Sequence, residues 1–199
     1  MQRKTLDAIL TTGGLMLAIV LVVAGVLLTW GYKFADNSVH DQLAAQKIVF
    51  PPKGSEALKP AEIGPFLNQY AGEQLTSGAQ AKAYADHFIA VHLQGIGGGK
   101  TYAQLSAQAQ ANPTDVALKA KVDTMFRGET LRGMLLDAYA FWKLGQIAKW
   151  GAIASFILAG VMFVLTALGF RHLRRASEVD EVHIAPAAHQ EKELATASV

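Results

Sequence analysis

The sequence predicts an all-α fold in which two transmembrane helices bracket an extracytoplasmic helical domain. Two apolar runs without a charged residue, 8–32 and 150–170, lie near opposite ends of the 199-residue chain. Each run is longer than the roughly 20 residues that a helix needs to cross a hydrocarbon core about 30 Å thick. Residues 33–149 between them carry helical periodicity, and no stretch shows the sustained alternation of a strand.

Basic residues beside the two runs predict the orientation of the chain. Lys and Arg accumulate on the cytoplasmic side of a span. We therefore expect residues 1–7 and 171–199 in the cytoplasm, residues 33–149 outside it, and the protein in the cell membrane. The basic residues on the cytoplasmic side are Arg3, Lys4, Arg171, Arg174 and Arg175. The bias is moderate, because the opposite flanks hold Lys33, Lys143 and Lys149.

A cleaved signal peptide is the alternative for the first run, since Arg3 and Lys4 resemble its basic start. The run is longer than an ordinary signal core, and residues 32–36 after it lack the small-x-small pair of a cleavage site. We therefore expect a retained anchor.

Composition excludes several classes of function. The chain has no cysteine, which rules out disulfides, thiolate metal sites and thiol catalysis. The formal net charge of +2 is too small and too dispersed to predict a nucleic-acid partner.

Helix-start and helix-stop signals divide the domain between the runs. The first helix should continue outward to Lys47 and stop before Ile48, because residues that precede a proline, here Pro51, disfavour the helical conformation. Residues 53–65 are expected to form a loop, with an extended piece before it at 47–50. An amphipathic helix should begin near Thr76 and Ser77 and end at the glycines of 95–99.

A second group of signals predicts the rest of the domain. A shorter helix is expected at 101–111, and Asn112 followed by Pro113 predicts the start of a long helix. No strong breaker separates that helix from the second run, so we expect it to continue into the membrane. The tail 171–199 has few large apolar residues after Arg175 and is expected to be disordered.

Residues 95–101, Gly-Ile-Gly-Gly-Gly-Lys-Thr, resemble a phosphate-binding P-loop. That motif needs a glycine where Gln94 stands, and Gly95 is one residue out of register. No strand precedes the segment. We interpret it as a turn between helices with Lys100 in solvent.

Histidines are the other candidates for chemistry. His87 and His92 are five residues apart, which places their rings about 140° apart around a helix. Zinc-binding helices present ligands four apart, so we expect no metal site, no cofactor and no enzyme here. A metal-dependent enzyme that uses His40, His87 and His92 is a third hypothesis.

The second run carries Gly151, Ser155 and Ala159 at spacings of four, and the first run offers Gly14 and Ala18. Small residues on one stripe let helices approach closely. We therefore take Gly151, Ser155 and Ala159 as a candidate packing face, either for the two spans or for a partner subunit.

Three segments, 34–51, 80–89 and 98–102, resemble a family of uncharacterised actinobacterial two-span membrane proteins. The most distinctive string is Gln46-Lys47-Ile48-Val49-Phe50-Pro51 after the first span. The resemblance implies the same two-span plan with an extracytoplasmic helical domain, and it brings no activity or site.

Gln42, Gln46, Lys47 and Phe50 form a candidate docking surface just above the membrane. The alternative is a structural corner that packs against the helix at 84–91.

Together these patterns predict a non-enzymatic two-pass membrane protein, an accessory or scaffold component of a membrane or cell-envelope complex. Its expected partners are the bilayer and either another membrane protein or a second copy of itself. The alternative is an extracytoplasmic ligand-sensing protein that acts through a separate cytoplasmic partner.

Overall fold

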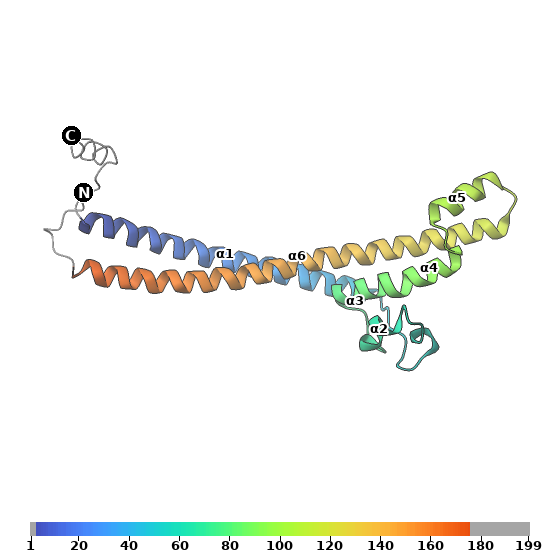
Figure 1. Cartoon of the computed structure of the whole chain (residues 1–199), viewed down its shortest axis with the longest axis horizontal. Helices are drawn as coiled ribbons and strands as arrows, with labels where there is room; N and C mark the ends of the chain where they lie inside the picture. The colour runs from blue at the N-terminus through green and yellow to red at the C-terminus, as the bar shows by residue number, and fades with distance from the viewer. Residues whose placement is uncertain (1–2, 176–199) are drawn as a thin grey trace, which may run out of the picture. The chain divides into compact units, whose positions relative to one another are not determined.

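The computed structural model describes residues 3–175, which are mostly helical. In these residues the only pairing of extended chain is one antiparallel bridge, between Val49 and Gln74. The all-α prediction is therefore confirmed. In chain order the helices are α1 (Arg3–Ala45), η1 (Glu56–Leu58), α2 (Gly64–Leu67), η2 (Asn68–Tyr70), α3 (Gly78–Ala83), η3 (Tyr84–Ile89), α4 (Ala90–Gly97), α5 (Tyr102–Ala111) and α6 (Val116–Leu173) (Figure 1).

The chain forms two compact units, and each is described by itself. Unit 1 contains the start of α1 and the end of α6, which among the described residues are 3–27 and 151–175. Unit 2 contains residues 28–150. The expected tail from residue 176 onward lies outside the described residues.

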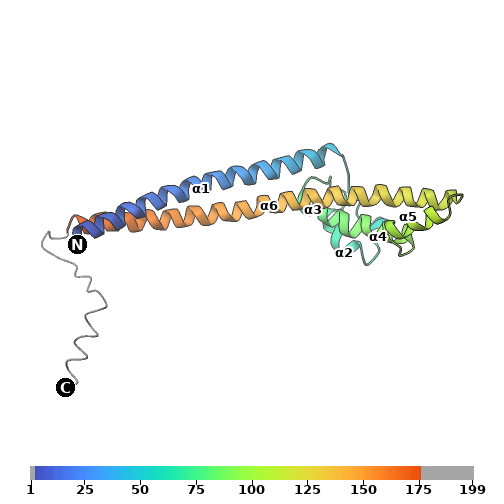
Figure 2. The ribbon, with the colours of Figure 1, turned by 90° about the horizontal axis from the view of Figure 1, so that it is seen from above.

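In unit 1 the two helices run antiparallel and side by side (Figures 1 and 2). Gly14 lies opposite Thr166, and Gly25 lies opposite Phe156. Buried residues recur every seven positions on each helix, which is the repeat of a left-handed coiled coil. We call this row the seam; its buried members are Thr11, Ala18, Gly25, Ala152, Ala159 and Thr166.

Glycines on α1 leave room for side chains of α6. A Cβ added at Gly25 would lie 2.8 Å from the ring of Phe156, closer than real side chains pack. A Cβ at Gly14 would lie 3.1 Å from the hydroxyl of Thr166. Side chains of α6 therefore pack directly on the backbone of α1 at these two positions, a contact that small residues allow between helices in a membrane.

The remaining faces of the two helices in unit 1 are apolar and uncovered. Side chains such as Val20, Leu27, Ile157 and Val164 are more than 60% exposed. By length and composition, α1 and α6 are each able to cross a membrane, and the predicted spans 8–32 and 150–170 lie within them.

A corner after α1 begins the core of unit 2. α1 ends at Ala45, and Lys47 turns the chain with a φ of 55°. Phe50 N–H then donates to Glu73 O at 2.9 Å, and Leu75 N–H donates to Ile48 O at 2.8 Å. These bonds fix the extended piece expected at 47–50. The largest fully buried side chains of the unit are Phe50, Leu43, Ile63, Leu67, Leu75, Met125 and Leu135.

The expected amphipathic helix is present as α3, η3 and α4, which lie beside α6 (Figure 2). Its cap is Ser77, whose hydroxyl accepts from Gln80 N–H at 3.3 Å while the Gln80 side chain accepts from Ser77 N–H at 3.0 Å. It ends at Gly98, which has the positive φ of 61° typical of a helix C-terminus. Its middle segment, η3, is a π-helix, which the amphipathic pattern does not predict.

The start of the long helix was predicted at the wrong residue. α6 begins at Val116, and its cap is Asp115, whose carboxylate accepts from Leu118 N–H at 2.9 Å. Asn112 instead ends α5, because its N–H donates to Gln108 O at 3.0 Å. From Val116 the helix continues to Leu173 without interruption, as the sequence predicted.

Candidate functional site

A groove between α1 and α6 is the larger of two candidate sites in unit 2. It has a volume of about 450 Å³, and we call it the α1–α6 groove. Its apolar lining is Phe34, Val39, Leu43, Met134, Ala138 and Phe141. Its polar lining is Ser38, Gln42, Gln46 and Asp137.

The two ends of the groove differ in chemistry. At one end Phe34 and Phe141 meet edge to face with ring centroids 6.3 Å apart, and Trp30 stacks on Phe34 at 5.7 Å. Towards the other end the Gln42 amide donates to Ser38 Oγ at 3.0 Å, and Gln46 follows one turn later. The groove is therefore aromatic at the end nearer the apolar run of α1 and rich in amides at the end farther from it.

The structure separates the four residues of the candidate docking surface. Gln42 and Gln46 are exposed and line the α1–α6 groove. Lys47 is exposed at the turn that follows α1. Phe50 is only 1% exposed, and its ring lies 5.3 Å from Tyr84, so it packs in the structural corner that was the alternative.

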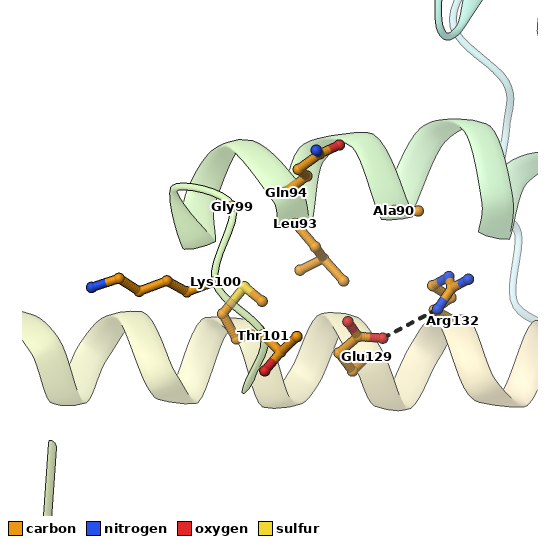
Figure 3. A pocket seen from close by; sticks show the side chains of 9 residues that line it. Ala90, Leu93, Gln94, Gly99, Lys100, Thr101, Glu129 and Arg132 are labelled. Carbon is orange, nitrogen blue, oxygen red and sulfur yellow. Dashed lines mark ion pairs between the residues drawn. The ribbon is translucent and has the colours of Figure 1, made fainter. Parts of the chain in front are cut away.

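The second candidate site, of about 220 Å³, lies beside the turn of Gly95–Gly99 and is called the glycine-turn pocket. Ala90 and Leu93 on α4 face Glu129 and Arg132 on α6, whereas the Lys100 side chain points away from Arg132 (Figure 3). Lys100 Nζ instead donates to Gln108 Oε1 at 3.1 Å.

The amides of this turn are used by the chain itself. Gly98, Gly99 and Lys100 donate their N–H groups to carbonyl oxygens at the end of α4. Thr101 N–H donates to Gln104 Oε1 at 2.9 Å. These four amides therefore cap helices and form no cradle for a phosphate, in agreement with the interpretation as a turn between helices.

Ion pairs link the π-helical segment to α6 next to the pocket. The Asp86 carboxylate lies 2.5 Å from Lys82 Nζ and 3.3 Å from one terminal guanidinium nitrogen of Arg132. The other terminal nitrogen of Arg132 lies 3.5 Å from the Glu129 carboxylate. Burial raises the pKa of Asp86, but hydrogen bonds and charge attraction from Lys82 and Arg132 outweigh burial and lower it overall. Burial raises the pKa of Tyr84.

Two of the three candidate histidines, His87 and His92, contact aromatic rings. His87 stacks on Phe66 with centroids 3.5 Å apart, and His92 Nδ1 lies 2.6 Å from Phe88 O. His40 is exposed on α1. Within residues 3–175, no three His, Asp or Glu side chains are grouped closely enough to hold a metal ion.

The candidate packing face of the second span lies at and beside the seam. Ala159 is 2% exposed and belongs to the seam, and Ser155 and Gly151 are half-buried. The spacing of four in the second run predicts only part of this contact, which follows a spacing of seven. The signal that would have found it is the matching series of small residues on the two runs, Thr11, Ala18 and Gly25 with Ala152, Ala159 and Thr166.

Comparison of the chain with models of protein families, with curated proteins and with solved structures finds no match. The class of the protein therefore rests on the features of the described residues. They form an all-α protein with two helices able to span a membrane and a helical unit, residues 28–150, that carries an apolar groove.

Proposed function

We propose that the chain is a non-enzymatic two-pass protein of the cell membrane that serves as an accessory component of a membrane or cell-envelope complex. Both termini lie in the cytoplasm, and residues 33–149 form the extracytoplasmic domain. The family resemblance of residues 34–51 supports the two-span plan.

Uncovered apolar surface in unit 1 supports the membrane part of this proposal. Large side chains away from the seam are exposed along both helices. Soluble proteins seldom expose a contiguous apolar patch of more than a few hundred Å². A bilayer covers such a surface without another protein, because lipid chains are as apolar as the side chains they contact.

One observation carries the accessory role: α6 exposes an apolar stripe before the second apolar run begins at Trp150. Four large side chains lie within an arc of about 80° around the helix, at 100° per residue. The members of this α6 stripe are Phe126, Met134, Phe141 and Leu144, which are 53%, 62%, 40% and 63% exposed. Exposed apolar patches of this kind mark contacts with proteins or membranes, and a partner subunit would cover this one.

Membrane topology is tested with single cysteines, because the natural chain has none. In intact cells, Ala111→Cys should react with a membrane-impermeant maleimide, whereas Ser177→Cys should react only after the cells are opened. Extraction by alkaline carbonate without detergent would overturn membrane insertion. Labelling of both cysteines in intact cells would overturn the orientation.

The accessory role is tested by affinity purification from native membranes in mild detergent, followed by mass spectrometry. We expect a stoichiometric membrane partner whose recovery falls in the double variant Met134→Gln/Leu144→Gln. The control is Thr124→Gln, which changes an exposed side chain on another face of α6. Recovery of the protein alone, or equal loss in both variants, would contradict a partner on the α6 stripe.

The glycine-turn pocket favours a second candidate, the ligand-sensing protein. Its lining combines apolar Leu93 with the charged Glu129 and Arg132, a mixture typical of small polar ligands. A metabolite that raises the melting temperature of the wild type, and no longer does so in Gln94→Trp, which places a ring in the pocket from an exposed position, would support this candidate. No shift across a broad panel would count against it.

A further inference from the structure

The α1–α6 groove is elongated. Its lining residues on α1 run from Phe34 to Gln46, which is about 18 Å of helix at 1.5 Å per residue. Its lining on the other helix runs from Met134 to Phe141, which is about 10 Å of α6. The groove therefore follows both helices lengthwise, a shape that suits an extended chain.

The lining indicates what kind of chain fits. Six of the ten lining residues are apolar, and Asp137 is the only charged one. With no lysine or arginine, the groove offers nothing to neutralise a phosphate. The amides of Gln42 and Gln46 suit an uncharged polar group at the far end, whereas the phenyl rings of Phe34 and Phe141 suit hydrocarbon.

The aromatic end of the groove continues from the apolar run of the first helix. Phe34 follows two residues after Tyr32, where the run ends, and it stacks on Trp30. Tyr32 also lies under Lys149 Nζ, which is 5.3 Å from its ring centroid. Trp and Tyr with a nearby lysine are typical of the level of lipid head groups. The aromatic end of the groove therefore begins next to that level along α1.

We propose that the α1–α6 groove binds one acyl chain of a membrane lipid that has an uncharged head group. The chain lies along Val39 and Ala138, and the head group reaches the amides of Gln42 and Gln46. This inference rests on the proposed membrane insertion. A partner on the α6 stripe would then cover Met134 and Phe141 from outside, over a groove filled with lipid.

Photo-crosslinking of the full chain tests the proposal. The protein is reconstituted in phosphatidylcholine vesicles that contain a small fraction of diacylglycerol with a diazirine halfway along one acyl chain. Crosslinked residues are then mapped by peptide mass spectrometry. We expect crosslinks in 8–32 and 150–170, and a second group at Ser38 and Met134. Ser38 stands about 9 Å beyond Tyr32, at 1.5 Å per residue, where bilayer hydrocarbon does not reach.

The outcomes separate this inference from the proposed function. Crosslinks confined to the two apolar runs would overturn lipid binding in the groove and leave membrane insertion supported. An absence of crosslinks in the runs would overturn membrane insertion itself, and the inference with it.

A matched pair of variants on α1 completes the test. Gln42→Trp places a large ring in the amide-rich part of the groove. It should lower the crosslinking yield at Met134 about tenfold, the effect of displacing roughly two methylenes from apolar contact. His40→Trp adds the same ring at an exposed position outside the groove and should leave the yield unchanged. Equal yields in the two variants would overturn the proposal, and circular dichroism verifies that both variants fold.

Discussion

Replacing Phe50 with alanine tests whether this residue is a core side chain or a docking anchor. The ring is 1% exposed and lies 5.3 Å from the rings of both Tyr70 and Tyr84. Truncation of a buried phenylalanine costs about 3–5 kcal/mol, from lost transfer free energy and the cavity left behind. The two aromatic contacts, at about 0.5–1.5 kcal/mol each, place Phe50→Ala in the upper half of that range.

The loss of stability should appear as a lower melting temperature of unit 2. For a unit of this size, 3–5 kcal/mol corresponds to a fall of roughly 10–20 °C. The full chain is melted in mild detergent while tryptophan emission is recorded. Trp30 and Trp150 are replaced by phenylalanine in every variant, so that the signal comes from Trp142 inside unit 2.

Val49→Ala is the matched control, because Val49 precedes Phe50 directly and is 57% exposed. It should change the free energy of unfolding by less than about 0.5 kcal/mol. If Phe50→Ala melts like Val49→Ala but no longer retains a copurifying partner, Phe50 is a docking anchor and the assignment to the core is wrong.

Three further substitutions probe other contacts. Gly25→Val should loosen the helix pair of unit 1, because a Cβ at Gly25 meets Phe156 at 2.8 Å. Gly160→Val is the control, because a Cβ at Gly160 has open space. In detergent, Gly25→Val should be cleaved by protease faster than Gly160→Val. Asp86→Asn should flatten the acid limb of the stability curve. With its pKa lowered, Asp86 contributes stability that is complete above its ordinary value of 3.8 and is lost as the pH falls through the lowered pKa. An unchanged acid limb would show that these ion pairs contribute little. Trp142→Phe removes the hydrogen bond of 3.1 Å that the Trp142 indole N–H donates to the Asp36 carboxylate. It should lower the free energy of unfolding in urea by about 1.5–3 kcal/mol, whereas Trp150→Phe should leave that free energy almost unchanged.

Much of the helical arrangement follows from local signals in the sequence. Ser77 with Gln80 and Thr101 with Gln104 both form the capping boxes that their spacing allows, and Gly98 ends α4. The start of α6 was misplaced because Asn112 and Asp115 are both good caps, and only the packed chain selects between them. Local patterns therefore locate helices better than they choose between adjacent caps.

The candidate sites were less accessible from the sequence. Gln42 and Gln46 were identified as exposed polar residues on one helix, but the groove also needs Met134 and Phe141, about 100 residues away. Phe50 looked suitable for docking because the sequence cannot tell which apolar side chain after a helix turns inward. Its burial depends on Tyr70 and Tyr84, which come from later helices.

The π-helical segment η3 corrects the phase of the helix that packs on α6. The buried residues Ala81, Ala85, Ile89 and Leu93 follow one another every four positions. In an α-helix of 3.6 residues per turn, such a row drifts about 40° at each step and would soon face solvent. The wider turns of η3, at Tyr84–Ile89, rotate the row back, so that Leu93 still reaches Gly128 on α6. If η3 were α-helical at its present length, Leu93 would lie about 120° around the helix from Ala81, whereas removing one residue from η3 would bring it back to within about 20°.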